Sequence, residues 1–189
     1  MACHPLAACS VAGIPSRLWT CETPWDWAGL LCHLARHDER DLAVRMLANA
    51  FVDVPHLEQP AAVLEWVQQN IQYVDDTPPV KLREWLRRLQ VGRPGEPFER
   101  FAGPARTLAL GTGDCDDSAR LVRAVLRSLG HRCRLVFVGS TSVPWHVTAA
   151  IRQGDGWYWL DASLAARPGE HPLKAKERID GQPHYNQAR

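Results

Sequence analysis

Three residue types that can carry out covalent acyl transfer follow one another along the chain. Cys115 lies in the segment GTGDCDDSARL, His146 in PWHVTAAI and Asp161 in GWYWLDAS. A cysteine thiolate attacks a carbonyl carbon when a histidine takes its proton, and a carboxylate on the second imidazole nitrogen orients the ring. The three residues therefore predict a thiol nucleophile, a general base that later acts as an acid, and an orienting carboxylate.

The element expected to position Cys115 is a helix that begins beside it. Apolar residues recur with helical spacing up to a stop at Gly130, at Leu121, Val122, Val125, Leu126 and Leu129. Asp114 is expected to cap the helix, with Asp117 three residues later in a capping-box position. In the first turn, free N–H groups and the helix dipole favour a thiolate. The aspartate charges oppose this, so a cationic histidine is needed to activate Cys115.

The elements expected to position His146 and Asp161 are two strands of a hairpin. The apolar period changes to two residues in this part of the chain, which predicts strands over 133–138, 145–151 and 156–162. A turn centred between Gly154 and Asp155 makes His146 and Asp161 diagonal neighbours on one face, whereas a three-residue loop centred on Gly154 pairs them directly. A turn centred between Asp155 and Gly156 would instead place His146 too far from Asp161.

The remaining sequence predicts helices before the strands. Helical stripes cover 39–51 and the segment after Pro60, a short basic helix is expected over 81–90, and 91–104 is expected to be a loop. The predicted organisation is an N-terminal extension over 1–38, irregular apart from one short helix, a domain over 39–163 with its core at 60–163, and a polar tail over 164–189. The fold class is therefore α+β.

The combined motifs resemble a known group of enzymes. GTGDCDDSARLVRAVLRSLGHRCRLVFVG, PWHVTAAI and GWYWLDAS are similar to the transglutaminase-like branch of the papain-type cysteine enzymes, and in detail to small single-domain members found in phages and prophages. The resemblance covers about residues 60 to 178. It implies a papain/transglutaminase-like core in which the catalytic-cysteine helix packs on an antiparallel sheet, with helices N-terminal to it.

The same resemblance implies a Cys115–His146–Asp161 triad that forms a thioester acyl-enzyme. The substrate is then an amide or peptide bond, and the acceptor is either water or an amine. A second oxyanion donor beside the Cys115 backbone stays open among the upstream residues Tyr73, Asn70 and Gln72. The alternative is a non-enzymatic structural or assembly protein, of phage type, that retains this fold and works through a protein partner.

Composition narrows the remaining function classes. Lys and Arg number 22 against 21 Asp and Glu, so a net charge of +1 gives no reason to expect nucleic acid or an anionic membrane as partner. The six cysteines include no CxxC pair, which indicates reduced thiols rather than disulfides or a zinc site. No signal-peptide pattern or long apolar run is found, so we expect a cytoplasmic protein.

The acidic cluster around Cys115 has an alternative interpretation as a cation site. Mg²⁺ and Ca²⁺ prefer carboxylate oxygens. Counted from Asp114, Val125 occupies the position where an EF-hand loop requires glutamate. Helix capping explains the aspartates better, and we expect neither a metal nor a cofactor.

Overall fold

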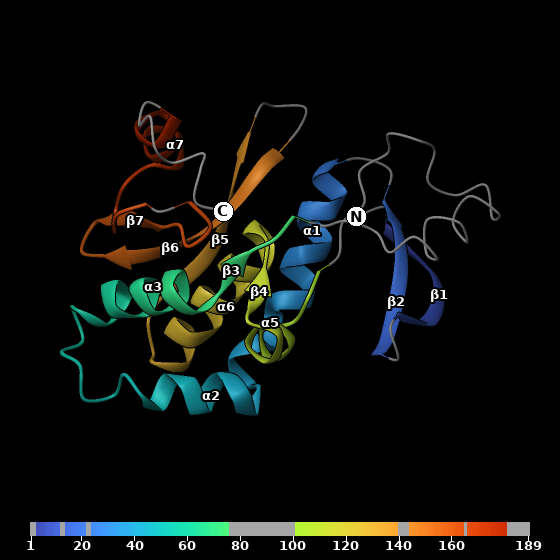
Figure 1. Cartoon of the computed structure of the whole chain (residues 1–189), viewed down its shortest axis with the longest axis horizontal. Helices are drawn as coiled ribbons and strands as arrows, with labels where there is room; N and C mark the ends of the chain where they lie inside the picture. Colours follow the sequence, from blue (N-terminus) through green and yellow to red (C-terminus); the bar gives the residue numbers. More distant parts are fainter. Residues whose placement is uncertain are drawn as a thin grey trace.

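The computed structural model describes residues 3–11, 14–21, 24–75, 101–139, 144–164 and 166–180, and it confirms the α+β class (Figure 1). The elements in chain order are β1 (Cys3–Val11), β2 (Ile14–Cys21), α1 (Pro24–Leu34), the 3-10 helix η1 (Ala35–Arg40), α2 (Leu42–Asn49), α3 (Gln59–Asn70), β3 (Gln72–Tyr73), α5 (Pro104–Leu110), β4 (Thr112–Gly113), α6 (Cys115–Ser128), β5 (Cys133–Gly139), β6 (Pro144–Gln153), β7 (Gly156–Leu160) and α7 (Pro172–Asp180). The basic helix predicted over 81–90 lies outside the described residues. Within them, no helix has both the length and the apolar character of a membrane span.

Helix α6 forms the centre of the hydrophobic core. It packs against β5 and β6 on one side, and η1, α2, α3 and α5 pack around the rest of its surface. The predicted apolar stripe is fully buried at Leu121, Val122, Val125 and Leu126. Complete burial of each such side chain is worth about 1.5–3 kcal/mol. The helix stops before Gly130, whose φ of 89° is readily adopted only by a residue without a side chain.

The three-stranded sheet has the order β5-β6-β7 and is antiparallel throughout. Gln153 pairs with Gly156, so the turn between β6 and β7 consists of Gly154 and Asp155. Of the two turn centres that the sequence left open for joining His146 to Asp161, the structure has the one between Gly154 and Asp155, and this register places both residues on the same face. Gly154 has a φ of 54°, which suits the first position of a tight hairpin turn.

Two predictions need correction at the residue where a helix begins. The helix expected over 39–51 begins only at Leu42, because the Asp41 side chain accepts the Ala43 N–H at 2.8 Å and thereby caps α2. The preceding turn is the separate 3-10 helix η1. Most of the loop predicted over 91–104 lies outside the described residues, and within them α5 begins at Pro104, a residue that suits the first helical turn.

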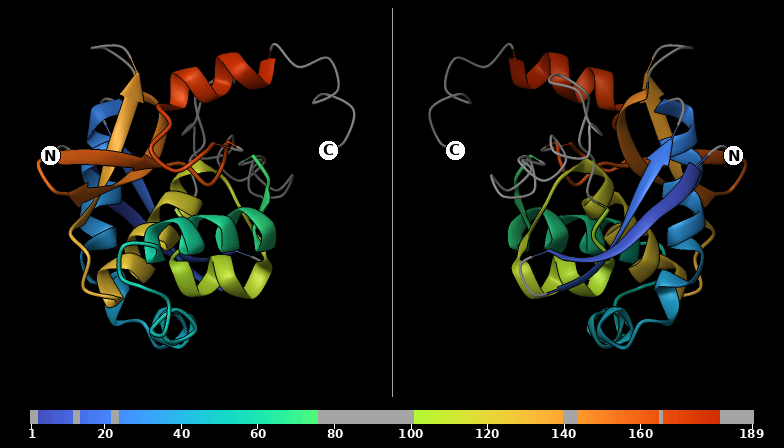
Figure 2. Two further views of the ribbon diagram at one scale, coloured as in Figure 1. Left: turned by 90° about the vertical axis from the view of Figure 1, so that its left-hand side faces the viewer. Right: turned by 90° about the vertical axis from the view of Figure 1, so that its right-hand side faces the viewer.

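Both predicted terminal segments contain regular structure that the sequence did not indicate. The extension over 1–38 was expected to be irregular with one short helix, and α1 is that helix, but β1 and β2 also pair there as an antiparallel hairpin. Pro5 and Pro15 weaken a strand pattern because proline lacks an N–H. The tail over 164–189 contains α7, whose buried positions are few, among them Pro172 and Ala175. The side views place α7 and α2 at opposite ends of the molecule (Figure 2).

Candidate active site

Cys115 is the first residue of α6 and is half-buried. Asp114 caps the helix as predicted, since its Oδ1 accepts the N–H groups of Asp116 at 3.2 Å and Asp117 at 3.4 Å. The cysteine packs against a small apolar cluster that contains Ala119 and Val147 of β6. The thiol therefore lies at a capped helix start, in an apolar cluster to which the strand that carries His146 contributes Val147.

Asp117 does not act as the capping-box residue that the sequence predicted. Its Oδ1 instead accepts the N–H of Ala102 at 2.7 Å, which joins α6 to the segment before α5. Gly113 is required for this approach, because a Cβ added there would lie 2.7 Å from the Asp117 Cβ. The Asp117 carboxylate therefore has a structural role next to Cys115, because it joins α6 to the segment before α5.

The structure joins His146 and Asp161 directly. The imidazole Nε2 lies 2.5 Å from Asp161 Oδ2, and the exposed fractions are only 8% for His146 and 1% for Asp161. Because Nε2 faces the carboxylate, proton transfer with a thiol falls to Nδ1 on the other side of the ring. The hairpin geometry inferred from the sequence thus brings these two residues together.

Asp161 is held by groups that sequence reasoning did not find. Its Oδ1 accepts hydrogen bonds from Ser163 Oγ at 2.8 Å and from the N–H groups of Ser163 and Leu164, both at 3.1 Å. Gln68 on α3 donates to the Asp161 backbone carbonyl at 3.1 Å and to that of Ala166 at 2.9 Å. One oxygen is fully engaged, so the other is directed at the imidazole. Ser163 follows Asp161 at the spacing of an Asx turn and was detectable in principle, whereas Gln68 was not.

Tyr73 is the upstream candidate that the fold brings near Cys115. Strands β3 and β4 pair in parallel and place Tyr73 opposite Gly113, with the Val74 N–H donating to the Gly113 carbonyl at 3.0 Å. Burial raises the pKa of the Tyr73 phenol above its ordinary value, and a hydrogen bond with the Asp75 carboxylate and the nearby charge of Cys115 raise it further. The phenol therefore stays protonated and can donate a hydrogen bond at neutral pH.

The other two upstream candidates are placed differently. Asn70 donates from its side chain to the Trp66 carbonyl of its own helix at 2.8 Å, and Gln72 is exposed. Of the residues that the sequence left open, Tyr73 is thus the one whose surroundings include the cysteine.

The acidic cluster can be tested as a cation site from its donor atoms. Asp114, Cys115 and Asp116 each offer one atom, and these atoms lie within 4.8 Å of one another. The Asp114 carboxylate already accepts two helix N–H groups, however, and a thiol is a soft ligand that hard cations avoid. The arrangement suits a capped helix start better than a metal centre.

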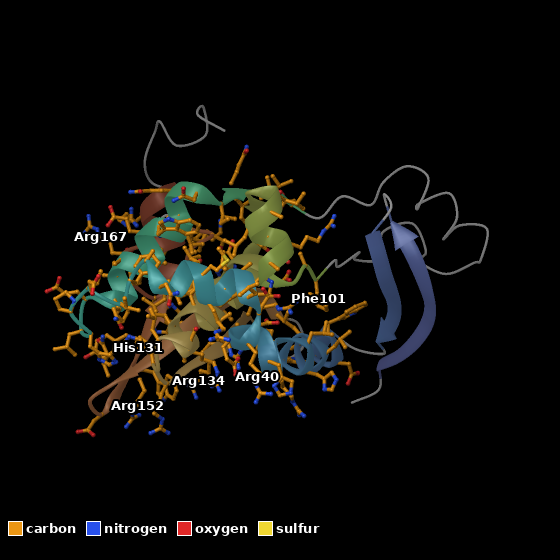
Figure 3. The ribbon with its side chains drawn as sticks, turned by 90° about the horizontal axis from the view of Figure 1, so that it is seen from below. Arg40, Phe101, His131, Arg134, Arg152 and Arg167 are labelled. Atoms are coloured by element: carbon orange, nitrogen blue, oxygen red, sulfur yellow. The ribbon has the colours of Figure 1, made fainter. Side chains whose placement is uncertain are left out.

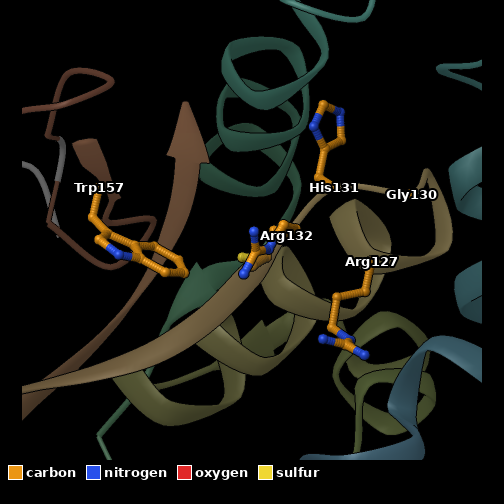
Figure 4. A pocket seen from close by; sticks show the side chains of 6 residues that line it. Arg127, Gly130, His131, Arg132 and Trp157 are labelled. Carbon is orange, nitrogen blue, oxygen red and sulfur yellow. The ribbon is translucent and has the colours of Figure 1, made fainter. Parts of the chain in front are cut away.

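A hollow of about 350 Å³ lies elsewhere on the sheet. Arg127, Gly130, His131, Arg132, Cys133 and Trp157 line it (Figure 4). None of the predicted triad residues belongs to this lining, so it is a feature separate from the candidate active site.

Comparison with known proteins identifies the group to which this chain is similar. A family model described as a transglutaminase-like domain matches residues 43–177. Among solved structures, a proposed cysteine protease from Cytophaga hutchinsonii is similar, with 18% sequence identity and a TM-score of 0.47. The alignment covers 70% of this chain and only 39% of that one. No curated protein matches the sequence.

Proposed function

Because the chain belongs to the family of transglutaminase-like domains, we propose that it is a cysteine hydrolase or acyltransferase that acts on an amide or peptide bond. Cys115 is the nucleophile, His146 the general base and then acid, and Asp161 the orienting residue. The observation that supports this most is the 2.5 Å contact between His146 Nε2 and Asp161 Oδ2, on a sheet that packs directly against the helix beginning at Cys115.

The proposed reaction proceeds in two steps, acylation of Cys115 and then deacylation. Cys115 Sγ attacks the carbonyl carbon as its proton passes to His146 Nδ1, and a tetrahedral oxyanion forms. The C–N bond then breaks as His146 returns that proton to the leaving amine, which leaves a thioester on Cys115. Water or a second amine attacks the thioester after His146 takes its proton, and the departing thiolate of Cys115 is reprotonated. Asp161 stabilises the imidazolium in both steps.

Two donors are proposed for the oxyanion. The first is the backbone N–H of Cys115, because the first turn of a helix directs its N–H groups out of the helix end, where negative charge is favoured. The second is the Tyr73 hydroxyl, whose single proton would turn from the Asp75 carboxylate to the oxyanion, because burial favours its protonated form and Cys115 lies close enough to affect it. A phenol can stabilise charge as it develops on the oxygen without itself losing a proton.

Alkylation of the thiols with iodoacetamide tests the proposed nucleophile. Near pH 6, Cys115 should react at least about tenfold faster than the other cysteines, because only an activated thiol forms a thiolate there. Cys133 and Cys32 are internal controls, since burial raises the pKa of Cys133 to about 12 and also raises that of Cys32. Mass spectrometry assigns each modified site.

His146→Ala should slow alkylation of Cys115 and leave the other thiols unchanged. If Cys115 reacts no faster than Cys32 and His146→Ala has no effect, the activated thiol is refuted. The non-enzymatic assembly role would then be the better account of the retained fold.

A second substitution tests the proposed oxyanion donor. Tyr73→Phe should lower kcat/KM for a p-nitrophenyl ester by about 10²–10³, the usual effect of losing one such donor. It should leave the rate of Cys115 alkylation unchanged, because displacement of iodide generates no oxyanion. An equal loss in both measurements would instead show that Tyr73 acts on the thiol itself.

A further inference from the structure

At the end of the sheet remote from His146, two strand arginines lie near one tryptophan, and two more arginines come from the end of α6 and the segment before β5. We call this the basic surface, and it consists of Arg127, Arg132, Arg134, Arg152 and Trp157. The Arg152 N–H donates to the Arg132 carbonyl at 2.9 Å, so these two residues are neighbours across adjacent chain segments. Arg152 also pairs with Trp157 across the hairpin. Figure 3 shows Arg134 and Arg152 on the same side of the molecule.

Three of these four arginines differ from Arg127 in forming no ion pair with another described residue. Within the described part of the chain, Arg132, Arg134 and Arg152 form no ion pair with a carboxylate. Arg132 and Arg134 are exposed, so a partner can reach them. Arg127 lies 3.6 Å from Glu39, which is also 4.0 Å from Arg123. Because the positive charges of Arg132, Arg134 and Arg152 repel one another, this surface should attract an anionic partner.

Trp157 organises these cations. The guanidinium carbon of Arg134 lies 3.9 Å from the centre of the indole ring, and that of Arg152 lies 6.0 Å away. Arg134 belongs to β5 and Trp157 to β7, so the ring must reach across β6, which lies between these strands. A guanidinium stacked on a ring keeps its N–H edge available and loses less side-chain freedom when it binds a carboxylate. The hollow beside Trp157 and Arg132 leaves room for an acidic side chain (Figure 4).

We propose that the basic surface binds an acidic segment of a partner polypeptide, one rich in aspartate or glutamate. Arginine forks match carboxylates in geometry as well as in charge. Single-stranded nucleic acid fits less well, because base stacking needs an open aromatic face and Arg134 already covers Trp157. The six residue steps along β6 from His146 to Arg152 span about 20 Å, so a docked segment leaves the candidate active site accessible.

A binding titration tests this proposal independently of catalysis. The full chain with Cys115→Ala is titrated into a fluorescein-labelled glutamate-rich peptide, and fluorescence anisotropy is recorded at low and high salt. We expect saturable binding that weakens as salt rises. Arg132→Glu combined with Arg152→Glu should weaken it at least about tenfold, the loss expected when about 1.4 kcal/mol of attraction is removed.

The matched control is Arg45→Glu combined with Lys174→Glu, which changes the net charge equally at exposed positions outside the basic surface. It should change the affinity by less than about twofold. If the charge reversal lowers the melting temperature, Arg132→Gln combined with Arg152→Gln gives the same test with a smaller expected loss.

Three results would overturn the proposal. The peptide could bind no better than a neutral peptide of the same length, or the control pair could weaken binding as much as the pair in the basic surface. Tighter binding of a labelled single-stranded oligonucleotide than of the peptide would point to nucleic acid instead. None of these outcomes depends on whether Cys115 is catalytic, so failure here and failure of the proposed function are distinguishable.

Discussion

The two ends of the three-stranded sheet treat charge in opposite ways. At the His146 end, Asp161 is 1% exposed and its carboxylate accepts hydrogen bonds from the imidazole, Ser163 and Leu164. At the Arg152 end, the cations of the basic surface lie open to solvent or half-buried, and in the described ranges of the chain three of the four form no ion pair with a carboxylate. Buried charge has to be satisfied by the chain itself, whereas exposed charge can be left for a partner. One end is built for fixed geometry and the other for association.

The largest effect should follow from a substitution that changes only which atoms carry protons at the His146 end of the sheet. In Asp161→Asn, the amide oxygen can keep the bonds from Ser163 and Leu164, so the NH₂ group faces His146 Nε2. The imidazole must then carry its proton on Nδ1, where it can no longer accept one from the thiol. We expect kcat for ester hydrolysis to fall about 10³–10⁴-fold.

The control for this prediction is the melting temperature, which should change little because the side-chain volume is conserved. A kcat within tenfold of the unsubstituted protein would show that Asp161 does not set the tautomer. The proposed fixed geometry of this end would then have no catalytic purpose.

A comparison of two arginines sharpens the contrast between satisfied and unsatisfied charge. Arg120 is buried, forms two 2.9 Å bonds with the Asp38 carboxylate and donates to the Ala102 carbonyl at 2.8 Å. Arg120→Gln removes the charge from a buried pair and should cost about 3–5 kcal/mol in the free energy of unfolding. Arg132→Gln in the basic surface should change it by less than about 0.5 kcal/mol.

Urea denaturation of both variants measures these two values. Equal losses in the free energy of unfolding would contradict the proposed difference between Arg120, which is paired within the chain, and Arg132 in the basic surface. A gain in stability for Arg132→Gln would strengthen it, because it would show repulsion that the fold tolerates.

The parts of the site that could be predicted from sequence are those set by local periodicity. A capped apolar stripe predicted the start of α6 at Cys115, and the turn residues between β6 and β7 left two registers that both join His146 to Asp161. The structure has the one with a two-residue turn at Gly154 and Asp155. Two-residue strands have no period, so the pairing that places Tyr73 opposite Gly113, two residues before Cys115, was not predictable. Contacts between distant residues were equally hidden: Gln68 and Asp161 are 93 positions apart.

The smallest predicted effect concerns His131. This buried residue lines the hollow next to the basic surface. It is 8% exposed, its Nε2 lies 2.8 Å from Gln59 Oε1, and its ring stacks on His56 with centroids 4.0 Å apart. Burial lowers the pKa of His131, and the neighbouring His56 lowers it further. The folded chain therefore favours the neutral ring more than the unfolded chain does.

The sign of the pH dependence follows from this shift. The stabilisation is complete above the unfolded pKa of about 6.5 and is lost as the pH falls through the lower folded value. The free energy of unfolding should thus decline more steeply below about pH 6.5 in the unsubstituted protein than in His131→Gln, as measured by urea denaturation across this range. His37→Gln, at an exposed position, should keep the full slope. If both variants show the same slope, His131 is not the titrating group, and the environment beside the basic surface is more hydrated than its burial indicates.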